Sequence, residues 1–415
     1  MPNSLAAARS RVFLSAWVLY AGYYICRKDI EPTTGHGISH LAVSLFCFGA
    51  SYAVGQFVGG MLADSGSIGA RRTALAGAGT SILCTALLAF HPLPVLELLL
   101  LLGNGLGQGL GWPSMLRLIG QWFRRGERDR VLGWWSTSYI LGGVLATTLT
   151  AWLTFHTRVI ALSGFHPAFL VSSSILLAAA LFFYFGTAHL PLPVLPHSPA
   201  LTSALRISQR ERTQRQAWIE ILTNRRIQVI SVLYFFLKMT RYTLLFWLPL
   251  YLTSSLGYSQ HSAEHFASYF ELLGFLGPLG AAYAVQRWFP ERRMTFGAGM
   301  LFALAFICLL HPVLAGSGWF GTAVSISCMG ILIYGADLLM SGMAVLDAVP
   351  EELHGRAAGF VNGIGSAGQT VSPFLVTVVV SQFGWAKLFD CFVCFALAAG
   401  AISAFDARLQ TDQTH

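Results

Sequence analysis

Long apolar segments alternate with short polar stretches along almost the whole chain. Most of these segments hold about 20 predominantly apolar residues, the length that an α-helix needs to cross a bilayer. The pattern predicts twelve such helices, over 12–32, 39–63, 73–91, 95–120, 130–155, 167–187, 227–254, 263–286, 294–314, 318–348, 356–382 and 386–405. We therefore expect an all-α membrane protein that crosses the bilayer many times.

The composition agrees with this pattern. Of the 415 residues, 55% are apolar and only 11% are charged, and the mean hydropathy is +0.61. A soluble protein usually carries about a quarter charged residues. This deficit excludes an ordinary soluble enzyme, a disordered chain and most nucleic-acid-binding proteins.

One long polar stretch, 188–226, divides the predicted helices into two groups of six. It is rich in arginine and proline, so we expect a linker between an N-terminal bundle (1–187) and a C-terminal bundle (227–415). An internal repeat supports the division, because Arg72 corresponds to Arg293 at an offset of 221, and Arg130 to Arg356 at 226. Two pseudo-symmetric six-helix bundles, twelve transmembrane helices in all, form the major facilitator fold, whose substrate site lies at mid-membrane between the halves.

The net charge of +8 follows the predicted loops. Of the 26 Lys and Arg residues, 20 lie in or beside alternate loops, whereas the opposite loops hold only Arg158 and Lys387. By the positive-inside rule, both termini and the linker are cytoplasmic. The basicity therefore indicates membrane topology, and we expect no nucleic-acid partner.

The end of the second predicted helix carries a conspicuous polar motif. Gly60, Asp64, Arg71 and Arg72 resemble a cytoplasmic loop motif of the major facilitator superfamily, in which the Asp caps a helix terminus and holds arginines of the neighbouring loop. The second-half copy has Gln286 where an acid is expected, so that copy is weaker. We assign Asp64, Arg71 and Arg72 to gating.

Two arginines lie inside predicted transmembrane helices. A charged side chain at mid-bilayer costs at least ~2.5 kcal/mol, so it usually faces a cavity or a partner. Arg27 and Arg241 each lie in the first helix of their half, 214 residues apart, and pseudo-symmetry places them opposite each other. Two facing guanidiniums indicate an anionic ligand, and the planar arginine fork suits phosphate. The alternative is that each snorkels to the membrane surface or forms a structural pair.

Other polar residues share these helix faces. Tyr20, Tyr24 and Arg27 form one stripe, and Lys238 lies three residues before Arg241. The acids deep in the membrane are Glu271 and Asp337. Four cations, counting Lys28, against two acids leave the region net positive by two, which predicts an anion-transporting cavity. Lys238 either contacts a dianionic ligand or is neutralised by one of the acids.

Four stretches of the sequence resemble the organophosphate:phosphate antiporters, a family that includes bacterial glycerol-3-phosphate and hexose-phosphate transporters. They are 20–28, 107–113 (with Gln108 and Trp112), Arg241-Tyr242 and Tyr269-Phe270-Glu271. The resemblance implies that Arg27 and Arg241 bind the phosphoryl group and that Lys28 forms an interdomain ion pair with Glu271.

The chain departs from that family around the phosphate pair. Tyr139 stands where a substrate-site histidine is expected, Gln56 replaces a lysine and Phe246 an acid, while Lys238 and Asp337 are additions. The sequence therefore leaves the organic part of the substrate open. The predicted substrate-binding residues are Arg27, Arg241, Lys238, Tyr20, Tyr24, Tyr139, Gln108 and Trp112. The predicted gating or ion-pair residues are Lys28, Glu271, Asp337, Asp64, Arg71 and Arg72.

The sequence carries no spacing typical of an enzyme, a metal site or a cofactor. Cys391 and Cys394 form a C-x-x-C within a predicted helix, which favours packing over metal or redox chemistry. We expect a monomeric antiporter of the bacterial inner membrane that exchanges an organic phosphate ester for inorganic phosphate. The alternatives are a proton-coupled organic anion transporter, with Asp337 or Glu271 titrating, and a sugar-phosphate sensor with a transporter fold.

Overall fold

The structure, a computed structural model, describes residues 2–28, 38–90, 93–161, 167–188, 214–290 and 292–412. Within these ranges the chain is helical and contains no strand, which confirms the all-α prediction. The first half comprises α1 (Pro2–Lys28), α2 (Ile38–Ala63), α3 (Gly69–Leu88), α4 (Pro94–Gly109), α5 (Gly111–Trp122), α6 (Arg125–Ala161) and α7 (Pro167–Thr187).

The second half repeats this order. It comprises α10 (Arg225–Ser254), α11 (Gln260–Gly274), α12 (Leu276–Trp288), α13 (Arg293–Gly316), α14 (Trp319–Leu338), the π-helical turn η1 (Leu339–Met343), α15 (Ala344–Ala348), the short η2 (Glu351–Leu353), α16 (His354–Phe383) and α17 (Trp385–Asp412). Counting α4–α5, α11–α12 and α14–α15 as one span each gives twelve spans in the described residues. Seven of the twelve meet a strict test of length and apolarity.

Two of the predicted helices break at positions that proline explains. A proline lacks the N–H that would bond the carbonyl four residues earlier, and its ring crowds that carbonyl. Pro113 removes the bond to Gly109, where α4 ends, and Pro278 removes the bond to Gly274, where α11 ends. The two breaks lie in the fourth helix of the first half and the second helix of the second half.

A helix that the sequence did not predict lies within the expected linker. It is α9 (Gln214–Thr223), which buries Ala217 and Ile221. Asn224 separates it from α10, accepting a hydrogen bond from the Ile227 N–H (3.1 Å) and donating one to the Ala348 carbonyl (2.9 Å). The linker residues 189–213 lie outside the described ranges, and the domain boundaries stay predictions.

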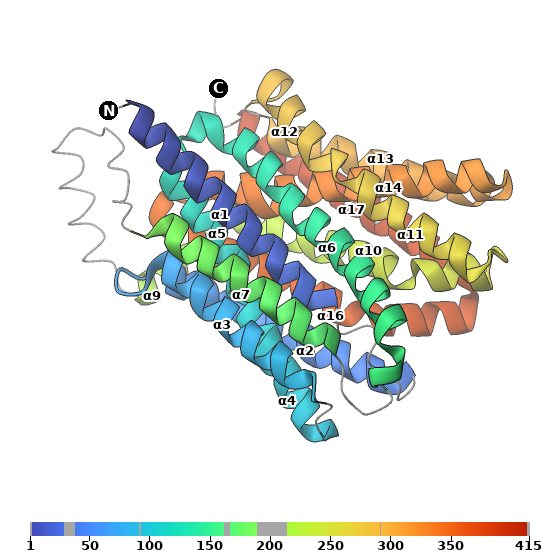
Figure 1. Ribbon diagram of the computed structural model, residues 1–415. Helices are drawn as coiled ribbons and strands as arrows, with labels where there is room; N and C mark the ends of the chain where they lie inside the picture. Colours follow the sequence, from blue (N-terminus) through green and yellow to red (C-terminus); the bar gives the residue numbers. More distant parts are fainter. Residues whose placement is uncertain are drawn as a thin grey trace.

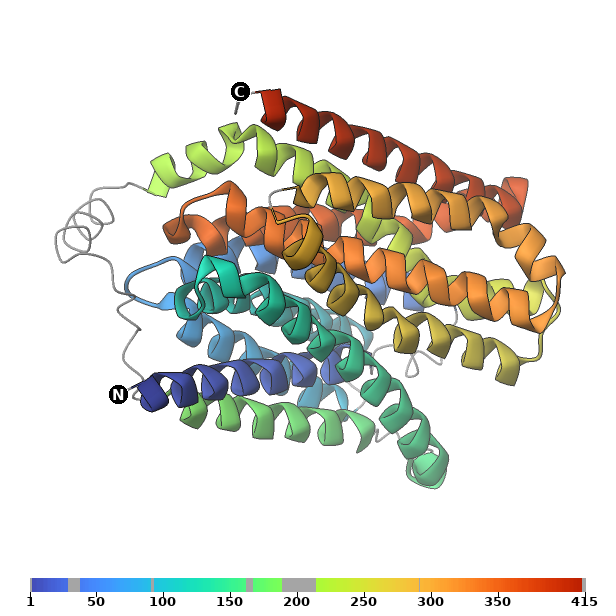
Figure 2. The same ribbon diagram turned by 90° about the horizontal axis from the view of Figure 1, so that it is seen from above.

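The two halves lie side by side, with α1–α7 on one side and α10–α17 on the other (Figure 2). They meet where α2 packs along α16 and α6 along α12. Glycines allow the α2–α16 contact to be close. A Cβ added to Gly60 would lie 2.5 Å from the Gly355 carbonyl oxygen, and one added to Gly359 would lie 2.3 Å from the Gln56 carbonyl oxygen.

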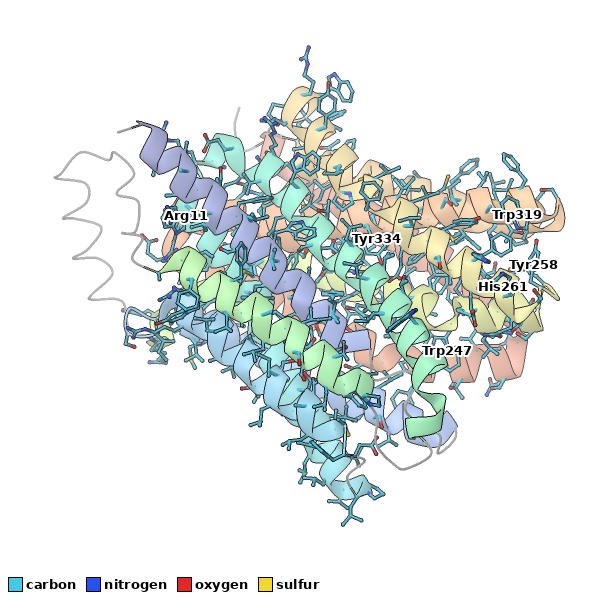
Figure 3. All side chains as sticks on the ribbon, viewed as in Figure 1. Arg11, Trp247, Tyr258, His261, Trp319 and Tyr334 are labelled. Carbon is cyan, nitrogen blue, oxygen red and sulfur yellow. The ribbon has the colours of Figure 1, made fainter. Side chains whose placement is uncertain are left out.

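Both chain ends lie on the side of the bundle that also carries α9 (Figure 1). We call this side, which includes Asp64 and the start of α16, the terminal end. Tyr258, His261 and Trp319 lie at the opposite, far end, and Tyr334 lies between the two (Figure 3).

Candidate functional site

Arg27 lies in the last turn of α1 and is enclosed by polar and aromatic groups. Its Nε donates to Oε1 of Gln108 (2.9 Å), whose Nε2 donates to Oδ1 of Asn104 (3.2 Å). The guanidinium carbon lies 4.3 Å from the ring centre of Tyr24 and 4.4 Å from that of Tyr52. These contacts fix the cation without neutralising it, and its Nη2 atom is buried without a hydrogen-bond partner.

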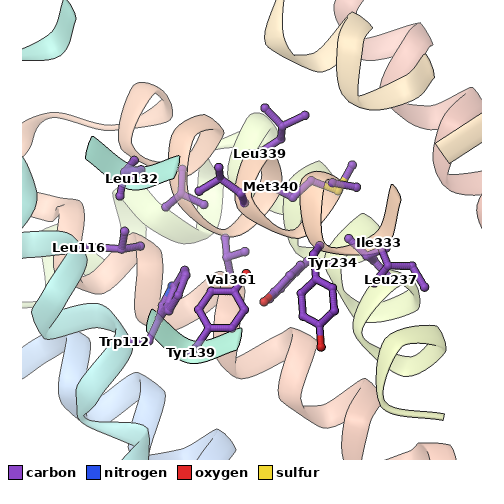
Figure 4. Packing of buried hydrophobic residues seen from close by; sticks show 14 of the residues in the cluster. Trp112, Leu116, Leu132, Tyr139, Tyr234, Leu237, Ile333, Leu339, Met340 and Val361 are labelled. Atoms are coloured by element: carbon purple, nitrogen blue, oxygen red, sulfur yellow. The ribbon is translucent and has the colours of Figure 1, made fainter. Parts of the chain in front are cut away.

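Arg241 of α10 forms a buried ion pair with Asp337 of α14, with Nη1 and Oδ2 3.1 Å apart. The same carboxylate accepts hydrogen bonds from the hydroxyls of Tyr139 (3.0 Å) and Tyr234 (2.9 Å); both side chains belong to the buried packing shown in Figure 4. The Tyr334 ring lies 4.4 Å from the guanidinium carbon. Asp337 is therefore held by three donors, from α6 and α10, and it neutralises Arg241.

Lys238, one turn before Arg241, points toward α16 instead of toward Asp337. Its Nζ donates to Oδ1 of Asn362 (2.5 Å) and to Oγ of Ser366 (2.7 Å), and it lies 5.3 Å from the ring centre of Tyr52. A Cβ added to Gly365 would lie 2.4 Å from Cδ1 of Tyr234 and 3.1 Å from Cδ of the lysine. Glycine at this position therefore leaves room for the Tyr234 ring and the lysine stem between α10 and α16.

The charges at the site do not balance. Among the described residues no carboxylate lies within ion-pair distance of Arg27 or Lys238, whereas Arg241 has Asp337. Among the described residues, three cations and one acid leave a net charge of about two positive units at the site; Lys238, Arg241 and Asp337 are almost fully buried and Arg27 is partly buried. Uncompensated buried charge is costly, so this arrangement favours an anionic ligand.

A cavity lies next to Arg27. Its volume is about 40 Å³, which corresponds to roughly three water molecules. It is lined by Tyr24, Arg27, Leu45, Phe48, Tyr242, Leu245, Phe246, Gln369, Thr370, Ser372 and Pro373. Thr370 follows the start of α16 by 16 residues, or about 24 Å of helix. The cavity is therefore about 24 Å along α16 from the contact with Asp64.

The remaining predicted binding residues form the packing beside the site. Tyr20 packs against Trp112 and Trp135, with ring centres 5.8 and 4.8 Å apart. Trp112 Nε1 donates across the halves to the Ser341 carbonyl (3.3 Å). Neither Tyr20 nor Trp112 lines the cavity, whereas Tyr24 does.

The predicted pair between Lys28 and Glu271 stays a prediction. The Lys28 side chain lies outside the described part of the structure, and Glu271 is buried on α11 with interactions of its own. The sequence reasoning did not select Tyr52, Asn362 and Ser366. Their one sequence signal is polarity within apolar helices, which many packing residues share.

At the terminal end, Asp64 joins the two halves. Its carboxylate accepts the backbone N–H groups of Gly355 (3.0 Å) and Arg356 (2.8 Å), at the start of α16. It also pairs with Arg117 of the first half (3.2 Å). A carboxylate at a helix N-terminus satisfies otherwise unbonded N–H groups and the helix dipole. Asp64 lies just beyond α2, and burial raises its pKa to about 6, against the lowering effect of the Arg117 charge.

Several more ion pairs cross between the halves at this end. Arg293 contacts Asp129 (2.7 Å) and also pairs with Asp347, which in turn lies 3.4 Å from Arg125. Arg128 pairs with Glu351. Together with Asp64 these residues form what we call the terminal gate, and the gate is closed in this structure.

The other predicted gate arginines lie elsewhere. Arg71 donates to Thr187 Oγ1 (2.8 Å) and to the Tyr184 carbonyl (2.9 Å), within the first half, and Arg72 donates to the Ser67 carbonyl (3.1 Å). Neither forms a described contact with Asp64. The guanidiniums around Asp64 belong to Arg117 and Arg356.

Twelve helices in two joined bundles, with a cationic site midway between a closed gate and the far end, define a membrane transport protein. Residues 12–373 match the Major Facilitator Superfamily, and the chain belongs to this family. The family consists of membrane transporters and not of enzymes, in agreement with the sequence analysis.

Curated relatives confirm the resemblance seen in the sequence. The chain is 26% identical over 394 residues to the glycerol-3-phosphate transporter of Bacillus subtilis, covering 91% of this chain and 87% of that protein. It is 26% identical over 420 residues to the membrane sensor protein UhpC of Escherichia coli, covering 94% and 90%. The crystal structure of the E. coli fucose:proton symporter FucP has the same fold, with a TM-score of 0.74 at 13% identity, covering 96% of this chain and 97% of that one.

Proposed function

We propose that the protein is an antiporter that exchanges an organic phosphate ester for inorganic phosphate. The observation that carries the proposal is the excess of two positive charges among Arg27, Lys238, Arg241 and Asp337, all of which are buried except Arg27, which is partly buried. A phosphate monoester carries a charge of about −1.5 to −2 at pH 7, and inorganic phosphate is a mixture of mono- and dianion there. The similarity to a glycerol-3-phosphate transporter supports the same class of substrate.

Exchange follows from the energetics of the empty site. A ligand that neutralises the cations lets the two halves close around it, whereas an empty site keeps two uncompensated charges at mid-membrane. Movement of the empty protein is therefore slow, and return requires a second anion. We place the terminal gate in the cytoplasm of a bacterium and the far end outside its inner membrane, in line with the distribution of Lys and Arg. We also propose that the monomer is the functional unit.

Counterflow in proteoliposomes tests the exchange. Labelled inorganic phosphate should enter liposomes that contain phosphate or glycerol 3-phosphate, and it should enter empty liposomes at least tenfold more slowly. Arg27→Gln should abolish uptake. Lys387→Gln is the matched control, because that cation is exposed and paired with Asp390. Equal uptake into empty and loaded liposomes contradicts obligate exchange, and dependence on an imposed pH gradient favours proton coupling.

A sensor is the second candidate, because one relative of equal identity is named a membrane sensor. A sensor needs the same anion site but no flux. Saturable binding of phosphate esters to the purified protein, with no counterflow above that of protein-free liposomes, would favour this function over transport.

A further inference from the structure

We propose that the phosphoryl group of the ligand binds between Arg27 and Lys238, while Arg241 stays in an internal ion pair with Asp337. This inference rests on the proposed function for the class of ligand and adds where its phosphoryl group binds. It differs from the arrangement that the family resemblance implies, in which Arg27 and Arg241 share the phosphoryl group.

Arg241 is already engaged. Its carboxylate partner lies 3.1 Å away and is also bonded by the Tyr139 and Tyr234 hydroxyls. Transfer of the guanidinium from Asp337 to a ligand would leave a buried carboxylate without its cation, and breaking a buried pair on one side is strongly destabilising. Asp337 therefore occupies the position on Arg241 that a phosphoryl oxygen would otherwise take.

Arg27, Lys238 and Arg241 each keep an unused donor, but among the described residues only Arg241 has a carboxylate partner. The Nη2 of Arg27 is buried without an acceptor. An ammonium has three N–H donors, and Asn362 and Ser366 use two of those of Lys238. Both cations lie over the same ring, that of Tyr52, at 4.4 and 5.3 Å from its centre. They are therefore at most about 10 Å apart, and one phosphoryl group with a charged hydrogen bond at each end spans about 8 Å between donor nitrogens.

The charge and the surrounding groups fit the same position. With Arg241 neutralised, Arg27 and Lys238 supply two positive charges, which match a phosphoryl dianion. Gln56 lies one turn after Tyr52 on α2, fully buried, and neither of its amide atoms has a hydrogen-bond partner. Relative to the family pattern, this chain adds one cation, Lys238, and one acid, Asp337, so the net charge of the site is unchanged. Because Asp337 neutralises Arg241, the uncompensated positive charge lies on Lys238 instead of on Arg241.

The organic part of the ligand then lies toward the cavity beside Arg27. Leu45, Phe48, Leu245 and Phe246 give this cavity apolar walls, and Gln369 lines it with a buried, unpaired Oε1. An amide oxygen at this point accepts a hydrogen bond from a hydroxyl group. The site therefore suits a small hydroxylated phosphate ester.

Affinity for inorganic phosphate tests the assignment, measured by isothermal titration of the full-length protein in lipid nanodiscs. Lys238→Gln should weaken phosphate binding at least tenfold, because a charged hydrogen bond is lost. The double variant Arg241→Gln/Asp337→Asn removes both members of the pair and should stay within about threefold of the unaltered protein. Lys387→Gln, the removal of an exposed lysine, should have no effect.

The opposite pattern overturns the proposal, with phosphate affinity kept in Lys238→Gln and lost in the double variant. If the double variant does not fold, Lys238→Gln alone decides, because the Arg27–Arg241 arrangement predicts unchanged phosphate affinity for it. Failure of the proposed function gives a different result, in which the unaltered protein itself binds no phosphate. A lysine that merely supports packing would lower the thermal stability of Lys238→Gln and leave its phosphate affinity unchanged.

Discussion

Closure of the terminal gate depends on the close approach of α2 and α16, and a single methyl group tests this. In Gly359→Ala the new Cβ would lie 2.3 Å from the Gln56 carbonyl oxygen and 3.2 Å from the Gly60 Cα. Favourable contacts between such atoms lie near 3.5 Å, so the helices must separate by about 1 Å. The atoms in the way are backbone, which cannot rotate aside.

Overpacking of this kind typically costs 1–3 kcal/mol. The cost applies only while α2 and α16 are in contact, so it destabilises the closed gate relative to the open one. At 1.4 kcal/mol per tenfold, the ratio of open to closed protein should rise about five- to 150-fold. Gly79→Ala and Gly299→Ala are matched controls, because a Cβ at either position meets no atom within 4 Å; alanine there should be neutral or slightly stabilising.

Double electron–electron resonance measures the gate directly. Spin labels at Ser67 and Arg292, which are exposed on opposite halves of the terminal end, should show a longer-distance population in Gly359→Ala and not in the two controls. An unchanged distance distribution in a folded Gly359→Ala protein would refute the idea that the α2–α16 glycine contact sets the closed state.

Two further predictions use the same labels. Burial raises the pKa of Asp64 to about 6 in the closed gate, above its ordinary 3.8. The closed gate therefore binds the proton on Asp64 more tightly than the open gate does, so this residue favours closure most below about pH 4. The effect is lost as the pH rises to about 6. Asp64→Asn should remove this pH dependence, and its persistence would point to another group. Asp347→Ala leaves Arg125 without its carboxylate partner and Arg293 with only Asp129. The population of the open gate should therefore rise at least fivefold. An unchanged distance distribution would show that Asp347 is dispensable for closure.

The sequence predicted the site partly and the gate partly. The cations Arg27, Lys238 and Arg241 were identifiable because a charge within an apolar helix is rare and costly. The partners of these cations were not. Lys238 and Asp337 were considered as a pair, but the structure pairs Asp337 with Arg241 and bonds Lys238 to Asn362 and Ser366. Choosing between such partners requires the rotation of each helix about its axis.

The gate shows the same limit. Asp64 was selected from its motif, but its guanidinium partners are Arg117 and Arg356 instead of Arg71 and Arg72. Arg117 lies 53 residues after Asp64 and Arg356 lies 292 residues after it. No local spacing connects such residues; only the packing of α5 and α16 against the end of α2 brings them together.

The sequence by itself determined the twelve helical spans, because a bilayer accepts only segments whose backbone groups bond internally and whose side chains are apolar. It also determined that cations lie among them. The breaks before Pro113 and Pro278 were not predicted, because Pro249, Pro312 and Pro373 lie within unbroken helices. The tertiary structure alone decided which cations, Arg27 and Lys238, keep their charge uncompensated and which one, Arg241, is paired. That outcome depends on distances of 3 to 5 Å between side chains of α1, α2, α10, α14 and α16, and those distances follow from how the two halves pack together.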